Sequence, residues 1–132
     1  MVPHPYSALA TLIALAIYIW TAILVSKART RYGIAAPACT GNEEFERRFR
    51  VQMNTQEQLV LLLPALWLCA IWVGEFYAGI GGLVWCIGRV IYVASYIRDP
   101  KSRAIGFVLT IVPTIVMMVA DAIRVVQFML LG

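Results

Sequence analysis

The stretch SALATLIALAIYIWTAILVS, from Ser7 to Ser26, contains no charged residue and is rich in Leu, Ile and Ala. An α-helix rises about 1.5 Å per residue, so about 20 such residues cross the roughly 30 Å hydrocarbon core of a bilayer. The segment before it carries no Lys or Arg, and the stretch itself is longer than the apolar region of a signal peptide. We therefore expect an uncleaved first transmembrane span.

The whole chain has the same apolar character. Of its 132 residues, 61% are hydrophobic and 14% are charged, and the mean hydropathy is +0.80. Soluble domains carry about 25% charged residues. This composition predicts an all-α integral membrane protein, a single domain over residues 1–132, and it disfavours a soluble enzyme or a nucleic-acid-binding protein.

Three further spans are expected downstream, because apolar runs alternate with turn residues. Gly33, Pro37 and Gly41 indicate a polar loop between residues 27 and 44, and Asp99 followed by Pro100 breaks the chain again. The second helix should begin with charged turns and end in an apolar run. The sequence thus predicts a four-transmembrane-helix bundle, with spans at about residues 7–26, 45–73, 80–97 and 104–131.

The distribution of basic residues predicts the orientation of these spans. Short cytoplasmic loops carry an excess of Lys and Arg. Nine of them cluster around the first and third loops: Lys27, Arg29, Arg31, Arg47, Arg48, Arg50, Arg98, Lys101 and Arg103. We therefore expect both termini to face away from the cytoplasm. A chain this short, without an organellar retention signal, fits a bacterial inner membrane better than the endoplasmic reticulum.

No metal site is expected from the sequence. The single histidine is His4, near the N-terminus, and Cys39, Cys69 and Cys86 lack metal-binding spacing. The last two lie in apolar runs, where a thiol usually behaves as a small hydrophobic group.

The start of the second helix carries a column of polar side chains. Arg47, Arg50, Asn54 and Glu57 are spaced i, i+3, i+7 and i+10, which places them on one helical face. Two guanidinium groups, an amide and a carboxylate are thus presented together at the basic side of the membrane.

The third span carries a second column, formed by Arg89, Tyr92 and Tyr96, and the following loop brings Arg103 to the same membrane side. An arginine inside a span costs about 2.5–3.5 kcal/mol on insertion scales, so Arg89 should face protein or a water-filled cavity. Two roles stay open for it: a ligand contact, or a structural pair with a buried partner such as Glu57.

A structural alternative also exists for the other basic residues. Lys27, Arg29 and Arg48 can anchor helix ends at anionic headgroups, while nearby carboxylates pair with the arginines. These carboxylates belong to Glu43, Glu44 and Glu46.

The two columns together suit a small polar ligand that carries two carboxylates and an ammonium group. Guanidinium pairs bidentately with carboxylate, and a glutamate pairs with the amine. A glutathione-like peptide has this charge pattern. The apolar surface beside the columns suits a hydrophobic second substrate that arrives from the membrane.

The run FERRFRVQMNTQEQLVLLLPALW (45–67), with GRVIYVASY (88–96) and the downstream Arg103, resembles the MAPEG family, the membrane-associated proteins of eicosanoid and glutathione metabolism. The resemblance covers essentially the whole chain, including the loop TGNEEFER (40–47). It implies a homotrimer of four-helix bundles in membrane lipid. Glutathione, as co-substrate, would bind between neighbouring subunits at the cytoplasmic end.

The resemblance also implies roles for individual residues. Arg103 matches the family arginine beside the glutathione sulfur, where a fixed cation favours the thiolate. The residues that match the glutathione-binding positions are Arg29 from the first helix, Arg50, Asn54 and Glu57 from the second, and Arg89, Tyr92 and Tyr96 from the third.

The sequence departs from some family members at three positions. Gln58 and Ala104 stand where certain eicosanoid-forming branches have Tyr and Ser, and Tyr92 replaces a histidine of the prostaglandin E synthase branch. These differences favour a general glutathione transferase or peroxidase over a prostaglandin isomerase. The alternative is a non-catalytic member that presents a lipid to a partner; a channel is disfavoured, because the polar columns stop near mid-depth.

Overall fold

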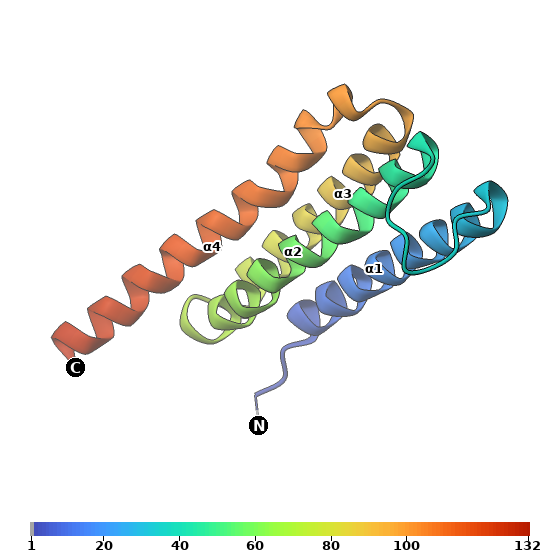
Figure 1. Cartoon of the computed structure of the whole chain (residues 1–132). Helices are drawn as coiled ribbons and strands as arrows, with labels where there is room; N and C mark the ends of the chain where they lie inside the picture. Colours follow the sequence, from blue (N-terminus) through green and yellow to red (C-terminus); the bar gives the residue numbers. More distant parts are fainter. Residues whose placement is uncertain (1) are drawn as a thin grey trace.

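The computed structural model describes residues 2–132, and this part of the chain forms four long helices (Figure 1). They are α1 (Pro5–Tyr32), α2 (Glu43–Trp72), α3 (Glu75–Arg98) and α4 (Ala104–Leu131), with one 3₁₀ turn, η1 (Pro100–Ser102), between α3 and α4. Each long helix has the length and apolar character needed to cross a membrane. The chain is an all-helical, multi-pass integral membrane protein.

The helices extend beyond the expected spans because their ends are capped. The predicted loop from residue 27 is wrong for its first six residues, since α1 continues to Tyr32 and stops at Gly33, whose φ of 68° is left-handed. The N–H of Ile34 then bonds to the carbonyl of Arg29 at 3.1 Å. Basic side chains in these last turns complement the helix dipole, so the helix does not end where the apolar run does.

The start of α2 is also defined by a capping residue. Asn42 precedes the helix in extended conformation, and its side chain accepts a hydrogen bond from the N–H of Phe45 at 3.1 Å. Acidic residues fill the first turn, where they complement the positive end of the helix dipole. Helix α3 also begins earlier than expected, at Glu75, so the turn before it is short.

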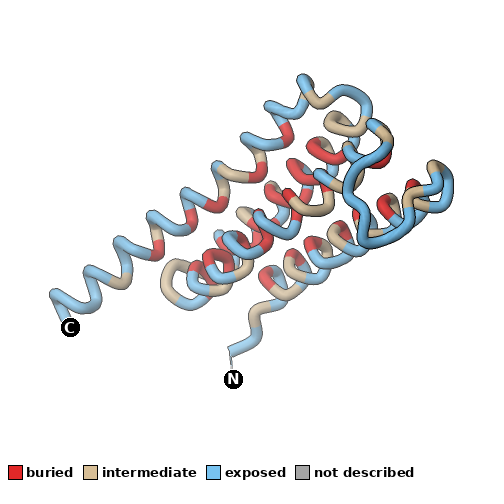
Figure 2. Tube along the Cα trace, viewed as in Figure 1, coloured by how far each residue is buried: buried red, intermediate tan, exposed pale blue. Residues whose placement is uncertain are grey.

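The two central helices are α2 and α3, which pack against each other and against both α1 and α4. The N- and C-termini lie at one end of the bundle, and the α1–α2 loop and η1 lie at the other (Figure 1). Trp85, Leu62 and Leu66 are fully buried in the core. Figure 2 shows buried positions on the inward helix faces and exposed positions on the outward faces. Those outward faces are largely apolar, as contact with lipid requires.

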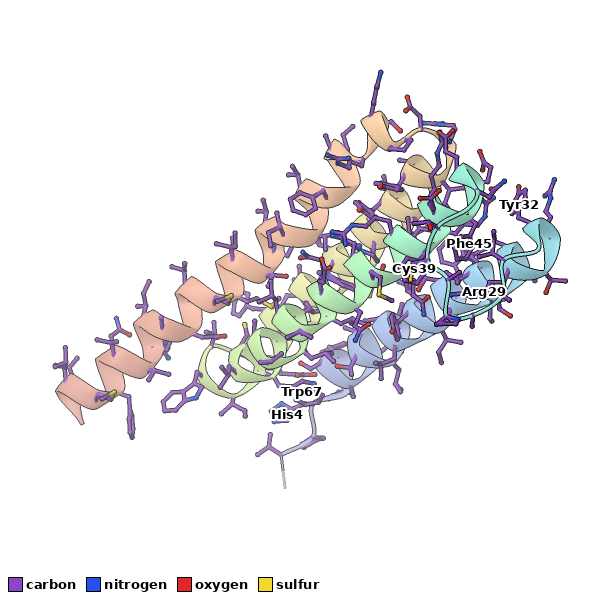
Figure 3. All side chains as sticks on the ribbon, viewed as in Figure 1. His4, Arg29, Tyr32, Cys39, Phe45 and Trp67 are labelled. Atoms are coloured by element: carbon purple, nitrogen blue, oxygen red, sulfur yellow. The ribbon has the colours of Figure 1, made fainter. Side chains whose placement is uncertain are left out.

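At the end of the bundle that holds the termini, hydrogen bonds from Glu75 connect α3 to α1. Its carboxylate accepts hydrogen bonds from the backbone N–H groups of Tyr6 and Ser7, the latter at 3.0 Å, and from the Ser7 hydroxyl. The first residue of α3 thus caps the first turn of α1. His4 and Trp67 pack edge to face at this same end (Figure 3).

Candidate functional site

A pocket of about 760 Å³ opens between α2, α3, η1 and α4, at the end of the bundle opposite the termini. It contains five of the eight predicted site residues. The lining residues are Arg50, Asn54, Tyr92, Tyr96, Lys101, Arg103, Ala104, Phe107 and Val108.

Helix periodicity brings the α2 and α3 side chains together. Arg50 and Asn54 lie one turn apart on α2, and Tyr92 and Tyr96 lie one turn apart on α3. The two tyrosine rings stack, with centroids 5.6 Å apart and an interplanar angle of 27°. Two residues of each polar column expected from the sequence therefore form neighbouring walls of the pocket.

The third wall depends on Gly106 in α4. A Cβ atom at this position would lie 2.4 Å from the backbone nitrogen of Tyr92 and 2.5 Å from its Cα. Only a glycine allows α4 to approach the α3 backbone so closely, as small residues do at membrane helix interfaces. This approach places Ala104, Phe107 and Val108 opposite the tyrosines.

The pocket is strongly basic. Arg50, Lys101 and Arg103 line it, and none of its nine lining residues is acidic. The Arg50 guanidinium also pairs with Glu57, at 3.2 Å between Nη1 and Oε1. Both side chains of this pair are about half exposed, 52% and 53%, so the pair contributes little to stability and is free to exchange for a ligand.

Arg89 lies behind the pocket wall and does not line it. Its side chain is 0% exposed, and its Nη1 donates to Asn54 Oδ1 at 2.7 Å and to Thr55 Oγ1 at 3.3 Å. Its guanidinium carbon lies 4.2 Å from the centre of the Tyr92 ring. Of the two roles left open for Arg89, the structural pair does not involve Glu57, which pairs with Arg50. The buried partner is the Asn54 amide on the same helix face.

The contact with Arg89 orients Asn54. Because Asn54 Oδ1 accepts the Arg89 hydrogen bond, its amide N–H groups are left for the pocket. The same guanidinium packs against Tyr92, so one buried cation supports two pocket residues from behind.

Arg29 and Glu57 are the other predicted site residues that do not line the pocket, and Arg29 lies at the α1–α2 loop. It donates to the carbonyl of Ala38 at 2.8 Å, and its guanidinium lies 4.8 Å from the centre of the Phe45 ring. Figure 3 shows Arg29 and Phe45 near Cys39 and the α1–α2 loop. Arg29 therefore stabilises the α1–α2 loop through these two contacts.

The remaining arginines of α2 make structural contacts. Arg48 pairs with Glu44 at 3.0 Å, and Arg47 pairs with Glu43 at 2.6 Å. Arg47 also donates to the carbonyls of Ile97 and Arg98, at 3.2 and 3.3 Å, and so caps the end of α3. The expected pairing of these arginines with nearby carboxylates is confirmed for Glu43 and Glu44.

Several lining residues were not expected from the sequence: Lys101, Ala104, Phe107 and Val108. The last three are spaced i, i+3 and i+4, which is a helical face pointing in one direction. That spacing was available in the sequence, but it does not distinguish a lipid-facing face from the wall of a pocket.

The fold and the pocket define a class: multi-pass membrane proteins with four helices and a basic pocket at one end, flanked by apolar helix surface. The MAPEG family model matches residues 7–123, and the chain belongs to this family. It is 43% identical over 114 residues to an uncharacterised protein, sll1147, of Synechocystis sp., covering 86% of this chain and 83% of that protein.

Two further relatives carry functional names. Microsomal glutathione S-transferase 2 of Homo sapiens is 38% identical, over 68% of this chain and 61% of the relative. Leukotriene C4 synthase of Bos taurus is 33% identical, over 70% of this chain and 62% of the relative. The chain thus matches a little under two thirds of the length of these two enzymes.

Proposed function

We propose that this protein is a membrane-bound, glutathione-dependent transferase that conjugates hydrophobic electrophiles or uses glutathione to reduce lipid hydroperoxides. The observation that carries the proposal is the pocket itself, which combines three cations, an amide and two tyrosines with an apolar wall. Family membership and the glutathione transferase among the relatives support it.

The charges of the pocket complement those of glutathione. The tripeptide carries two carboxylates, which suit Arg50 and Lys101, and the Asn54 amide offers neutral donors beside them. Its ammonium group suits the Glu57 carboxylate, which Arg50 holds next to the pocket. Glutathione binding would thus replace a weak, exposed ion pair with two contacts to the ligand.

Arg103 is proposed to activate the thiol. The thiolate is the nucleophile, and a free thiol has a pKa of about 8.5, so a nearby cation in a poorly hydrated site increases the reactive fraction. A guanidinium remains charged and does not compete for the proton. After the thiolate attacks the electrophile, the product is a thioether and the leaving group departs with its electron pair.

The second substrate is proposed to enter from the bilayer. Phe107 and Val108 form an apolar wall beside Arg103, and Val108 also belongs to the exposed apolar face of α4. A hydrophobic electrophile dissolved in lipid can therefore reach the thiolate without crossing water.

The family resemblance adds a quaternary proposal. In a homotrimer, Arg29 would reach the pocket of a neighbouring protomer from the end of α1, while Arg89 would act only through Asn54 and Tyr92. Both termini would face away from the cytoplasm, in a bacterial inner membrane, and the pocket would open on the cytoplasmic side.

The proposal is tested by calorimetry of the full chain in detergent with glutathione, followed by a conjugation assay with a chlorinated nitrobenzene. Binding and conjugation are expected for the wild type and for Arg48→Ala, which removes an arginine outside the pocket. Absence of glutathione binding by a folded protein would overturn the proposal and favour a non-catalytic, lipid-presenting role. Binding without conjugation or peroxidase activity would overturn the enzymatic part alone.

A further inference from the structure

Arg103, the residue proposed to activate the thiol, lies at the junction between η1 and α4. It lines the basic pocket, but its side chain is exposed and forms no hydrogen bond that caps α4. A long, exposed arginine side chain has many rotamers, so the place of its guanidinium depends on where the backbone carries it. The contacts that hold the turn between α3 and α4 therefore decide how close this cation stays to a ligand.

The turn itself is short and closed by local hydrogen bonds. Asp99 Oδ1 accepts a hydrogen bond from the N–H of Lys101 at 3.1 Å, and the N–H of Ser102 donates to the Asp99 carbonyl at 2.9 Å. Both bonds join residues within the turn. They give η1 its shape, but they do not fix it against the helices that form the pocket walls.

The hydroxyl of Ser102 joins this turn to α3. Its Oγ lies 3.0 Å from the carbonyl oxygen of Ser95 and 2.8 Å from that of Asp99, so one hydroxyl hydrogen is shared between two acceptors. Ser95 belongs to α3 and directly precedes Tyr96, whose side chain lines the pocket. The contact therefore connects the residue before Arg103 to the residue before Tyr96.

The end of α3 is a firm support for this contact. The last carbonyls of a helix have no donor within the helix. Here Arg47 of α2 donates to the carbonyls of Ile97 and Arg98, at 3.2 and 3.3 Å. The end of α3 is thus held by α2, and Ser102 extends this support to η1.

Ser102 does not itself line the pocket, although Lys101 and Arg103 on either side of it do. Its hydroxyl is bonded to carbonyls at the end of α3 instead. Any effect of this side chain on the chemistry of the pocket must therefore act through its two neighbours in the sequence.

We propose that Ser102 is a positioning residue for thiol activation, because its hydroxyl holds η1 against the end of α3 and so keeps the Arg103 guanidinium at the pocket. The inference rests on the proposed role of Arg103. Loss of a neutral hydrogen bond shifts the balance between closed and open turns about 2- to 13-fold. In the open turn the cation lies farther from the thiolate and is better hydrated, so its attraction for the thiolate is weaker.

Three substitutions at this position test the proposal on the full chain in detergent. Ser102→Ala and Ser102→Val remove the hydroxyl, whereas Ser102→Thr retains it, and threonine and valine have nearly the same shape. The readouts are the thiolate absorbance of bound glutathione against pH and the turnover of a chlorinated nitrobenzene. In the alanine and valine variants the bound thiol should titrate at higher pH and turnover should fall about two- to tenfold, with the KM for glutathione nearly unchanged. The threonine variant should resemble the wild type.

A control and a second measurement complete the test. Ser26→Ala removes an exposed serine near the same end of the bundle and should change neither readout. Amide hydrogen exchange over residues 98–103, measured without glutathione, tests the hydroxyl contact itself and should be at least about twofold faster in Ser102→Ala than in Ser102→Thr.

Unchanged exchange in Ser102→Ala would overturn the proposal. Faster exchange with wild-type thiol titration and turnover would also overturn it, since Ser102 would then serve only the stability of the turn. Comparison with Arg103→Ala separates this inference from the proposed function. A thiol titration that moves in Arg103→Ala but not in Ser102→Ala removes the role of Ser102 alone, whereas a titration that moves in neither removes the activating role of Arg103 as well.

Discussion

Replacing Arg89 by methionine distinguishes a residue that supports the pocket from one that binds glutathione directly. Methionine has a similar reach but no charge and no donors. The substitution removes the hydrogen bonds to Asn54 Oδ1 at 2.7 Å and to Thr55 Oγ1 at 3.3 Å. It also removes a fully buried charge. These two effects oppose each other.

Their magnitudes are similar. Hydrogen bonds from a charged donor contribute about 1.5–3 kcal/mol each, and only the shorter bond here has good length. Removal of the buried charge stabilises the folded protein by about 2.5–3.5 kcal/mol on insertion scales. We therefore expect the stability of the folded protein to change by no more than about 2 kcal/mol.

Glutathione affinity should respond differently, because Asn54 and Tyr92 lose the contact that orients them. Loss of one well-placed neutral hydrogen bond to the ligand corresponds to about 0.5–1.5 kcal/mol, or about 2- to 13-fold in Kd. Calorimetry in detergent measures this, with thermal unfolding as the check on folding. Arg89→Lys should recover part of the affinity, since an ammonium group can still donate to Asn54.

Arg48→Met provides a matched control, because it removes an arginine of α2 that pairs with Glu44 outside the pocket. It should leave glutathione affinity unchanged. A folded Arg89→Met variant with wild-type affinity would refute the supporting role of Arg89.

Four further predictions test other parts of the account. Arg50→Ala should weaken glutathione binding by about 1.5–3 kcal/mol without changing helical content or oligomer size; loss of the oligomer with affinity retained would make Arg50 a structural brace. In a cysteine-free background, a thiol at Ala38 should be labelled from the cytoplasm and one at Tyr77 from outside, and the reverse pattern would invert the proposed topology. Gly106→Ala forces a Cβ onto the α3 backbone and should cost about 1–3 kcal/mol in thermal or denaturant unfolding; wild-type stability would contradict the close packing. Glu75→Ala removes the cap of α1 and should cost about 0.5–2 kcal/mol, and no change would show that water replaces the cap.

The helices were predictable because their apolar runs are long, but their ends were not. Helix α1 continues through Lys27 and Arg31 because Gly33 terminates it, and α2 begins two residues before Phe45 because Asn42 caps it. Hydropathy reports where a chain enters lipid, whereas capping reports where a helix ends. In this protein the two points differ by up to six residues.

The part of the site that could be predicted is the part that follows from the spacing of residues along each helix. The spacing of Arg50, Asn54, Tyr92 and Tyr96 correctly placed each pair on one face, and these side chains meet in the pocket. The helical phase gives the direction in which a side chain points but not how deeply it is buried. The sequence therefore could not show that Arg89 lies behind the residues that line the pocket.

The fourth helix contributes in a way that spacing does not reveal. Phe107 reaches the pocket because Gly106 allows α4 to approach Tyr92, and this contact joins residues that are distant in the sequence. This contact depends on the packing of α4 against α3.

The central claim is that Arg103 stabilises the glutathione thiolate, and the thiolate absorbance of bound glutathione, titrated against pH, tests it most directly. In the wild type, the bound thiol should titrate well below the pKa of about 8.5 for a free thiol. In Arg103→Ala the titration should move to higher pH and turnover with a chlorinated nitrobenzene should fall, while glutathione affinity falls less than in Arg50→Ala. Arg103→Lys should restore part of the rate. An Arg103→Ala protein with an unchanged titration and wild-type turnover would contradict the account.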